Sequence, residues 1–458
     1  MNKKTKDRLA GIGIVIFWLG VWQLAAFFVH NRILIAGPAE TLQALLREAV
    51  TASFWKTVGV SLFRVTAGFL AAFFAGCLLA AVSFKSSIVQ RLLAPVMQFA
   101  KAVPVASFVV ILLIWWGADS LSVAISFLVT LPIIYVSFLE GLTHVDKNLE
   151  EMARVFHLRF PVKALYIVRP ALAPFLEGAL QTALGMSFKA GVAAEVIGTP
   201  RWAIGTALYE SKIYLDTAGV FAWTAVVVAL SFLLEKLFLF FFRKLRDWQP
   251  FLAGKEQDYP AEDVKVCGLS QGYGEKPVLR DVNALYRKGK SYCLMAPSGA
   301  GKTTLLLTMA GIYAPKAGNV SGSSHASVLF QEDRLLPGAT VLQNVAAAAG
   351  EEKAKQILTD LGISDVLLRK TEELSGGMKR RVSLARALAC GGDCLLLDEP
   401  FTGLDGENRK KAADCIRKYA NGRMVLVSTH DSEDASLLDG EIVTIKRENR
   451  TDGSCKNE

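Results

Sequence analysis

A glycine-rich turn between a short apolar strand and a helix is the strongest chemical signal in this sequence. The strand is expected at 291–295 and the helix at 303–310. Backbone N–H groups of such a turn and of the helix N-terminus surround a phosphate group, and the helix dipole adds to the attraction. Lys302 would reach the terminal phosphates of a nucleotide, and Thr303 would ligate Mg²⁺. The residues expected to form this site are Ser298, Gly299, Ala300, Gly301, Lys302, Thr303 and Thr304.

Two carboxylates follow a second apolar strand. The run 395–397 is entirely leucine and leads directly into Asp398 and Glu399. Asp398 would hold Mg²⁺, directly or through water, and Glu399 would polarise the water that attacks a phosphate. An acidic pair at a strand end also occurs as a simple helix cap, which is the alternative interpretation. Together with the glycine-rich turn, the pair favours nucleotide hydrolysis.

The segment Leu374-Ser-Gly-Gly-Met378 resembles the signature of the ABC ATPase family. Such a segment forms a second helix N-terminus that can bind phosphate, and it faces a nucleotide held by the opposite subunit. The resemblance implies that ATP is hydrolysed with Mg²⁺, and that His430, after an expected strand at 424–427, contacts the γ-phosphate. It also implies that Gln331 senses Mg²⁺ and water. Further implied nucleotide contacts are Ser375, Gly376, Gly377, Tyr273 on the adenine, and Asp405 in the D-loop.

Two positions depart from the family patterns. Ala296 occupies the first glycine of the strict phosphate-loop pattern, and we expect it to constrain the loop and to lower nucleotide affinity. Met378 stands where many family members carry glutamine, a change that we expect to be tolerated. The remaining glycines, Lys302 and the two threonines keep most of the phosphate cradle.

The N-terminal half has the composition of a membrane domain. Only 20% of the whole chain is charged, its mean hydropathy is +0.34, and apolar stretches dominate up to about residue 243. About 20 apolar residues cross a bilayer as a helix. Between the first two apolar stretches, Pro38–Val50 predicts an amphipathic surface helix. We expect six spans, at roughly 9–30, 57–82, 102–118, 120–143, 171–198 and 216–242.

Charge predicts the orientation of these spans. Lys3 and Lys4 precede the first span, Arg243 and Lys244 follow the last, and the net charge is +9. The positive-inside rule then predicts that both termini and the ATPase half lie in the cytosol. The spans are expected to lie in the cytoplasmic membrane, in contact with its lipid. The first apolar run is longer than that of a signal peptide and is expected to be retained. No motif for groove reading or base stacking accompanies the charge, so no nucleic-acid partner is expected.

The cytosolic segment 144–170 has the features of an element that transmits force. Val155, Phe156, Leu158 and Phe160 would give it an apolar face that docks in a groove. Pro170 and Pro174 would make a rigid joint by breaking the helix at the membrane boundary. The alternative is a merely amphipathic loop. The segment resembles the coupling loop of binding-protein-dependent ABC importers, whose pattern Glu151, Ala153 and Pro170 match, while His157 replaces the glycine of the family.

The wider membrane half, about 35–240, resembles permeases of the nitrate, sulfonate and taurine importer group. The resemblance is carried by Ser61-Leu-Phe-Arg-Val-Thr-Ala-Gly-Phe69, by Pro104-Val-Ala106 with Trp116-Gly117, and by Ala193-Ala-Glu-Val-Ile-Gly198. Within the fifth span, Lys189 and Glu195 are costly in lipid. One interpretation is that they line the translocation path, and the other is that they snorkel or pair with charges elsewhere in the bundle. Both interpretations stay open.

The seven cysteines predict buried structural thiols rather than a metal site. Six of them lie in or beside the ATPase half, which belongs in a reducing compartment. Cys390 and Cys394 are close in sequence, but no nearby cysteine or histidine completes a tetrahedral set. Cys394 also lies in an apolar strand.

These patterns predict a multi-domain protein. An all-α, six-helix transmembrane permease domain of the type I importer kind at 1–245 is followed by a linker at 246–261, an α/β ABC nucleotide-binding domain at 262–446 and a polar tail at 447–458. The resemblance implies ATP-driven transport of a small, organic or anionic solute, imported from an extracytoplasmic binding protein. A signature that serves nucleotide across an interface also implies a homodimer with two composite sites. The alternatives are an ABC exporter and an ATP-regulated membrane sensor or scaffold with weak hydrolysis.

Overall fold

The computed structural model describes residues 3–29, 31, 33–256, 258–274, 276–297 and 299–444. The predicted nucleotide contact Ser298 and the predicted tail 447–458 lie outside these residues. Contacts divide the chain into a first unit, Met1–His144 with Ala171–Asp247, and a second unit, Val145–Pro170 with Trp248–Glu458. The segment predicted to transmit force therefore groups with the C-terminal half, although it lies within the N-terminal half of the sequence.

The regular elements in the described part of the first unit are all helices. Helix α2 is the predicted amphipathic helix, and it begins at Pro38, where a proline costs no hydrogen bond. The carboxylate of Glu40 accepts a hydrogen bond from the N–H of Gly37 at 3.3 Å, which completes the cap. The helices are α1 Lys3–Val29, α2 Pro38–Ala49, α3 Ala52–Lys85, α4 Ser87–Ala102, α5 Val105–Trp116, α6 Ala118–Thr143, α9 Arg169–Gly198, α10 Ile204–Ile213 and α11 Thr217–Asp247.

Three described helices, α3, α6 and α11, are long and apolar enough to cross a membrane. The span predicted at 102–118 is not one straight helix. The structure has α4 and α5 there, bent by 102° at the break before Pro104. A residue that precedes proline is pushed into extended backbone, as Val103 is at φ −73° and ψ 130°. The pair counts as a fourth span if it crosses as one bent unit, and Gly13–Val29 of α1 is a shorter apolar helix, so the predicted six spans are not reached on length and composition.

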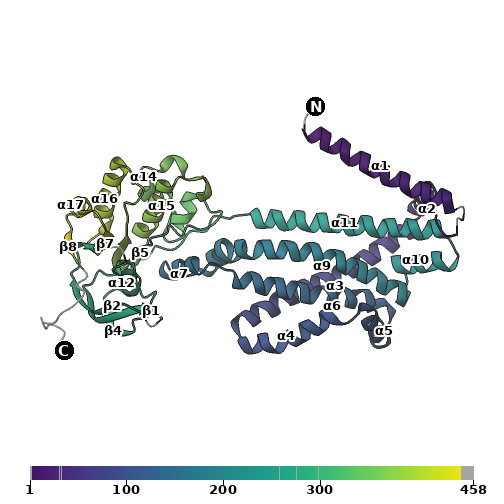
Figure 1. The fold of residues 1–458 in the computed structure, drawn as a ribbon, viewed down its shortest axis with the longest axis horizontal. Helices are drawn as coiled ribbons and strands as arrows, with labels where there is room; N and C mark the ends of the chain where they lie inside the picture. The colour runs from purple at the N-terminus through teal and green to yellow at the C-terminus, as the bar shows by residue number, and fades with distance from the viewer. Residues whose placement is uncertain are drawn as a thin grey trace. The chain divides into compact units, whose positions relative to one another are not determined.

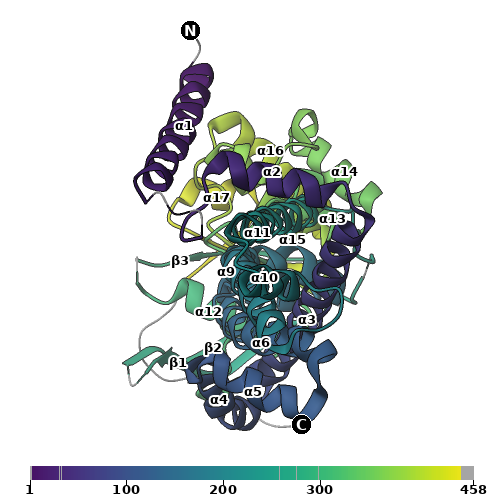
Figure 2. The same ribbon diagram turned by 90° about the vertical axis from the view of Figure 1, so that its right-hand side faces the viewer.

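The long helices α3, α6, α9 and α11 run side by side, as Figure 1 shows from the side and Figure 2 nearly end-on. One apolar cluster joins all four, because Phe69, Ile134, Leu180 and Leu239 pack together in it. Glycine permits the closest approach, since a Cβ atom at Gly68 would lie 2.2 Å from the carbonyl oxygen of Val123. Small residues at such contacts are how helices associate in a lipid environment.

The second unit contains two sheets. A parallel sheet has the strand order β5-β6-β7-β3-β8, and a smaller antiparallel sheet has the order β2-β1-β4. Every residue of β6 and β7 is buried, as expected for strands covered on both faces. The strands predicted at 291–295, 395–397 and 424–427 are confirmed. The strands are β1 Val264–Tyr273, β2 Lys276–Tyr286, β3 Ser291–Met295, β4 Ala317–Ser321, β5 Ser327–Leu329, β6 Cys394–Asp398, β7 Met424–Thr429 and β8 Glu441–Val443.

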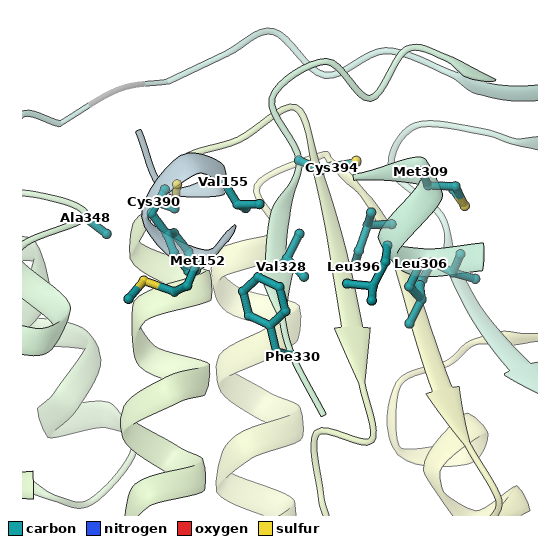
Figure 3. Close-up of a cluster of buried hydrophobic side chains, with 14 of the residues drawn as sticks. Met152, Val155, Leu306, Met309, Val328, Phe330, Ala348, Cys390, Cys394 and Leu396 are labelled. Carbon is teal, nitrogen blue, oxygen red and sulfur yellow. The ribbon is translucent and has the colours of Figure 1, made fainter. Parts of the chain in front are cut away.

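The helices of this unit include one from the middle of the sequence. Helix α7 (Lys147–Val155) contributes Met152 to the apolar core that also contains Val328, Phe330 and Cys390, as Figure 3 shows. The core therefore unites two distant stretches of chain. The other helices are α8 Phe160–Lys163, α12 Lys302–Met309, α13 Val341–Ala346, α14 Glu351–Asp360, α15 Gly376–Ala389, α16 Gly406–Ala420 and α17 Ser432–Leu437, with 3₁₀ turns at Ser364–Val366 and Thr371–Glu373.

The predicted helix break at Pro170 and Pro174 is wrong. Helix α8, a π-helical turn at Ala164–Val168 and α9 follow one another without a gap. Proline lacks an N–H group and crowds the carbonyl four residues earlier. The carbonyl four residues before Pro170 belongs to Tyr166, inside the wider π turn, which accommodates the missing hydrogen bond. Pro174 lies within α9.

The cysteines described in the second unit are mostly buried, as predicted. Cys293, Cys390, Cys394 and Cys415 are buried. Burial raises the pKa of the Cys293 and Cys415 thiols to about 11, which keeps them protonated and unreactive at neutral pH. Within the described ranges, no group of three histidine, cysteine or acidic side chains is arranged to hold a metal ion.

Candidate functional site

The glycine-rich turn joins β3 to α12 and is shaped by two glycines. Gly299 and Gly301 have left-handed backbones, with φ of 77° and 97°. At Gly301 a Cβ atom would also lie 2.8 Å from side-chain atoms of both Val278 and Leu279. Backbone conformation and space therefore both require glycine at this position. The turn exposes its N–H groups at the start of α12, the arrangement that binds phosphate.

Lys302 and Ala296 are joined inside this turn. The Lys302 side chain is 7% exposed, and its Nζ atom donates a hydrogen bond to the carbonyl oxygen of Ala296 at 2.6 Å. Ala296 thus contributes a backbone atom, and it is not among the residues with a left-handed backbone. The contact needs no glycine at 296. The same Nζ atom lies 3.2 Å from the ring nitrogens of His430.

Thr303 and Asp398 bring two hard oxygen ligands together. The Thr303 hydroxyl donates to a carboxylate oxygen of Asp398 at 2.7 Å. The buried Ser428 hydroxyl at the end of β7 donates to the other oxygen and orients the carboxylate. A hydroxyl and a carboxylate oriented by a neighbour are the ligand types that Mg²⁺ prefers. The donor set therefore fits this ion.

Glu399 follows β6 with an unusual backbone. Its φ is 48°, and left-handed backbone costs a non-glycine residue roughly 1–2 kcal/mol. Its N–H donates to the carbonyl oxygen of Ser428 at 3.1 Å. Its carboxylate lies 3.0 Å from Nε2 of His430 and accepts a hydrogen bond from the Thr402 hydroxyl at 3.3 Å. The structure thus brings the predicted Glu399 and His430 together beside Lys302.

The signature and the D-loop place their side chains at helix N-termini. Ser375 caps α15 by accepting a hydrogen bond from the N–H of Met378 at 3.4 Å, and Ser375 and Gly376 are exposed. A Cβ atom at Gly377 would lie 2.8 Å from the carbonyl oxygen of Gly403. Asp405 caps α16 through the N–H of Asn408 at 2.8 Å, a hydrogen bond that lowers the pKa of its carboxyl.

The backbone gives the positions of two further residues that were predicted to contact nucleotide or Mg²⁺, Tyr273 and Gln331. Tyr273 is the last residue of β1, where it pairs with Lys276 in a hairpin. Gln331 is exposed two residues after β5, and its carbonyl oxygen accepts a hydrogen bond from Arg380 at 3.2 Å.

Arg380 is a site residue that sequence reasoning missed. It lies in α15, is 5% exposed, and donates to the backbone carbonyl oxygens of both Gln331 and Glu399. The available signal was its position three residues after the last glycine of the signature.

The segment predicted to transmit force contacts the rest of the second unit through Glu151. A carboxylate oxygen of Glu151 lies 2.8 Å from Nη1 of Arg334. One helical turn earlier, Nδ2 of Asn148 donates to the carboxylate of Glu332 at 3.2 Å. Glu332 follows Gln331 directly and Arg334 lies three residues after it, so α7 contacts the segment that follows β5.

The apolar face of α7 differs in part from the prediction. Val155, Phe156 and Leu158 are buried as expected, and so are Met152 and Ala153. Phe160 is 81% exposed, so its assignment to the docking face is wrong. It follows the left-handed residue His157 and begins α8, and these two features direct it away from the core.

His157 takes the conformation for which a glycine is suited. Its φ is 47°, so the histidine forms the tight turn after α7 despite its side chain. Its Nε2 lies 3.2 Å from Nδ1 of His325, whose ring stacks on Tyr259 with centroids 3.9 Å apart. Burial, then the nearby His325 and Lys163, lower the pKa of His157.

Lys189 and Glu195 are not brought together. Glu195 is fully buried and accepts hydrogen bonds from the Ser61 hydroxyl at 2.8 Å and the Gly205 N–H at 3.2 Å. Lys189 is exposed on the surface of the first unit. The two side chains occupy different environments, so they do not form one polar site.

Comparison with known proteins gives matches to both halves. Residues 279–402 match the family model of the ABC transporter, and residues 68–247 match that of the binding-protein-dependent transport system inner membrane component. The aliphatic sulfonates import ATP-binding protein SsuB 1 of Rhodococcus jostii is 36% identical over 192 residues, which cover 40% of this chain and 78% of the relative. The taurine import ATP-binding protein TauB of Escherichia coli O157:H7 is 36% identical over 201 residues, which cover 40% and 79%. A solved structure of a dimeric ABC transporter cassette, MJ0796, covers 40% of this chain and 94% of its own, at 27% identity and a TM-score of 0.37.

Proposed function

The chain belongs to the ABC transporter family, as an ATP hydrolase coupled to transport with permease and ATPase in one polypeptide, and we propose that it imports a small, organic or anionic solute. The solute would be delivered by an extracytoplasmic binding protein. Relatives named as sulfonate and taurine import ATP-binding proteins support this direction and substrate class. The domain boundaries that we propose are 1–245 for the permease, 246–261 for the linker and 262–446 for the ATPase.

The docking of α7 on the ATPase core is the observation that carries this proposal. A helix that comes from within the permease sequence is buried through Met152 and Ala153 and is tied by Glu151 to Arg334. Packed side chains and ion pairs of this kind transmit displacement between elements because interiors are dense. We propose Glu151, Ala153, His157 and Pro170 as the coupling residues.

The proposed chemistry at the ATP site assigns one task to each side chain. Lys302 and the N–H groups of residues 299–304 would bind the phosphates of ATP. Thr303 and Asp398 would hold Mg²⁺, and Gln331 is proposed to sense the ion and its water. Mg²⁺, when bound, neutralises charge that develops on the phosphate oxygens. Glu399 orients the attacking water and accepts its proton, and His430 bridges Glu399 and the γ-phosphate. Tyr273 provides the surface for adenine.

We propose that two copies of the chain complete each site. Ser375 and Gly376 are exposed at the N-terminus of a 14-residue helix, so they are available to a nucleotide bound by a second copy. Gly377 and Asp405 lie beside them. A symmetric homodimer would then contain two composite ATP sites and two permease domains. In the membrane, both termini and the ATPase would face the cytosol.

The test is ATP hydrolysis by the full chain in lipid nanodiscs, beside the variant Glu399→Gln. We expect turnover by the wild type and a loss of at least about 100-fold in the variant, since removal of a group that acts on the transition state costs this much. The binding of a fluorescent ATP analogue serves as the control, and it should be retained because the glutamine keeps the shape of the site.

Transport is tested in the same nanodiscs by adding binding proteins loaded with sulfonates, taurine or other small anions. Stimulated hydrolysis with one of them would support import and identify the substrate class. Accumulation of solute on the side opposite to the ATPase in proteoliposomes would contradict import. A protein that hydrolyses ATP only as a monomer in solution would contradict the composite site.

A further inference from the structure

The Arg380 side chain donates hydrogen bonds to backbone oxygens at the ends of two strands. Its Nη2 donates to the carbonyl oxygens of Asp398 and Glu399, the latter at 3.0 Å. Its Nη1 donates to the carbonyl oxygens of Phe330 at 2.7 Å and Gln331 at 3.2 Å. The same nitrogen lies 3.3 Å from a carboxylate oxygen of Asp333. One guanidinium therefore holds the ends of two neighbouring strands, β5 and β6.

We infer that Arg380 is a positioning residue for ATP hydrolysis, which fixes the backbone of Glu399 relative to that of Gln331. The backbone of Glu399 is left-handed, so it persists only where its surroundings hold it. The structure supplies two holds, one on the N–H of Glu399 from Ser428 and one on its carbonyl oxygen from Arg380. Without the second hold, the carboxylate loses its fixed place beside His430.

The choice of arginine follows from the geometry. A guanidinium is planar, stays charged and directs several N–H groups along fixed directions, whereas the lysine ammonium is a compact point charge. Only the fork reaches both strand ends at once. Burial lowers the pKa of Arg380, and the neighbouring Asp333 opposes this shift. Burial of this charge is costly, and the five oxygen partners offset the cost.

A second arginine of α15 shows what Arg380 connects to. Arg386 is 1% exposed and donates to the carbonyl oxygens of Asp333 at 3.0 Å and Arg334 at 2.9 Å. Its guanidinium also lies over the ring of Phe156 at 5.0 Å. Arg380 thus connects the start of the segment 330–334 to the end of β6. Arg386 connects the end of the same segment to Phe156, the residue that follows α7. Of these two arginines, Arg380 is the one that contacts Glu399.

The inference rests on the proposed role of Glu399 in hydrolysis. The experiment compares Arg380→Lys and Arg380→Met with the wild type in nanodiscs, and measures kcat and KM for ATP, nucleotide binding and thermal unfolding. Arg423→Lys is the matched control. Arg423 is 7% exposed and also donates to backbone oxygens, but to those of Tyr419, Ala420 and Gly392. Gly392 precedes β6, whereas Glu399 follows it.

We expect kcat to fall about 10-fold in Arg380→Lys and about 100-fold in Arg380→Met, because a small misplacement of a catalytic group costs up to about this much. KM and nucleotide binding should stay within about twofold, since the lost interaction acts on the transition state. Arg423→Lys should keep the kcat of the wild type. A purely structural role would instead lower the melting temperature and nucleotide binding together with kcat.

Two results would overturn the inference. One is a kcat within about twofold of the wild type in Arg380→Met while Glu399→Gln is inactive. The other is a parallel loss of kcat, nucleotide binding and melting temperature in Arg380→Lys. If Glu399→Gln keeps full turnover, the proposed role of Glu399 fails instead, and this outcome is separate from both. Should Arg380→Met fail to fold, the lysine variant alone decides by its kcat and KM.

Discussion

Nη1 of Arg334 lies 2.8 Å from Oε2 of Glu151 across 183 residues of sequence. The Arg334 backbone is left-handed, with φ of 43°, and its guanidinium lies 4.1 Å from the centroid of the Phe330 ring. The arginine thus reaches α7 from a loop that also bonds to α15. Because both side chains are largely shielded from water, this ion pair is stronger than an ordinary surface pair.

The first prediction concerns this ion pair. Arg334→Glu and Glu151→Arg should each uncouple hydrolysis from transport, because each places two like charges in contact. The double exchange should restore part of the coupling. A double-mutant cycle on the thermal unfolding of the full chain should give an interaction energy of roughly 1–3 kcal/mol. Additive effects, with no recovery in the double variant, would show that the pair does not join the two elements.

The second prediction concerns the apolar face of α7. Met152→Ala should destabilise the second unit by about 2–5 kcal/mol, because it leaves a cavity in a closed core. The matched control is Phe160→Ala, which removes a larger side chain that is mostly exposed and should change stability by less than about 0.5 kcal/mol. Chemical denaturation followed by fluorescence measures both. Equal effects of the two substitutions would contradict the docking of α7.

The third prediction is a pH dependence at His157. Its pKa is lowered in the folded protein, so the unfolded chain binds more protons in the range between the two pKa values. The stability that the neutral histidine contributes is therefore present above about pH 6.5 and is lost as the pH falls toward the folded value. The melting temperature of His157→Gly should fall less than that of the wild type between about pH 7.5 and about pH 5.5.

At neutral pH this glycine variant should differ from the wild type by less than about 1 kcal/mol, because relief of the left-handed strain offsets the lost contact with His325 and the added chain entropy. His325→Asn removes the same hydrogen-bonded pair without changing the backbone and should flatten the pH dependence as well. Parallel pH curves for all three proteins would disprove the role of the pair.

The fourth prediction concerns Mg²⁺. Thr303→Ala removes the hydroxyl that donates to Asp398, so hydrolysis should fall by about 100-fold or more and the Mg²⁺ concentration for half-maximal activity should rise. Thr402→Ala is the control, since its hydroxyl donates to the carboxylate of Glu399 at 3.3 Å rather than to a proposed Mg²⁺ ligand, so it should affect turnover mildly and leave the Mg²⁺ requirement unchanged. Chelation by EDTA should stop hydrolysis in the wild type. An unchanged Mg²⁺ requirement in Thr303→Ala would contradict the proposed ligand set.

Local patterns predicted the phosphate loop and the buried strands well. The strand before Ala296 and the run before Asp398 are short, apolar and bounded by turn residues, so their period and length were sufficient. The ABC family and the permease half were also predicted, because the signature and the coupling pattern are short and specific. The comparisons with known proteins agree with both.

Contacts between residues that are distant in the sequence, and the directions of helices, could not be predicted from local patterns. Arg380 is one of several basic residues in a helix, and only the fold shows that its guanidinium meets the ends of β5 and β6. The bend between α4 and α5 was missed because an apolar run has the same composition whether it is straight or bent. The exposure of Phe160 likewise depends on the turn at His157, whose left-handed backbone no composition reveals.

The order in which the ribosome delivers this chain gives the docking of α7 a further consequence. Met152 and its apolar neighbours emerge before Trp248, whereas the surfaces that cover them, including Phe330 and Cys390, are completed much later. At the usual pace of about 5–20 residues per second, the uncovered face would wait for roughly tens of seconds. During this interval the short helix is vulnerable to proteases and to premature association with other nascent chains. A chain that is released before β7 therefore lacks Met424 and Leu426, which complete the core around Met152.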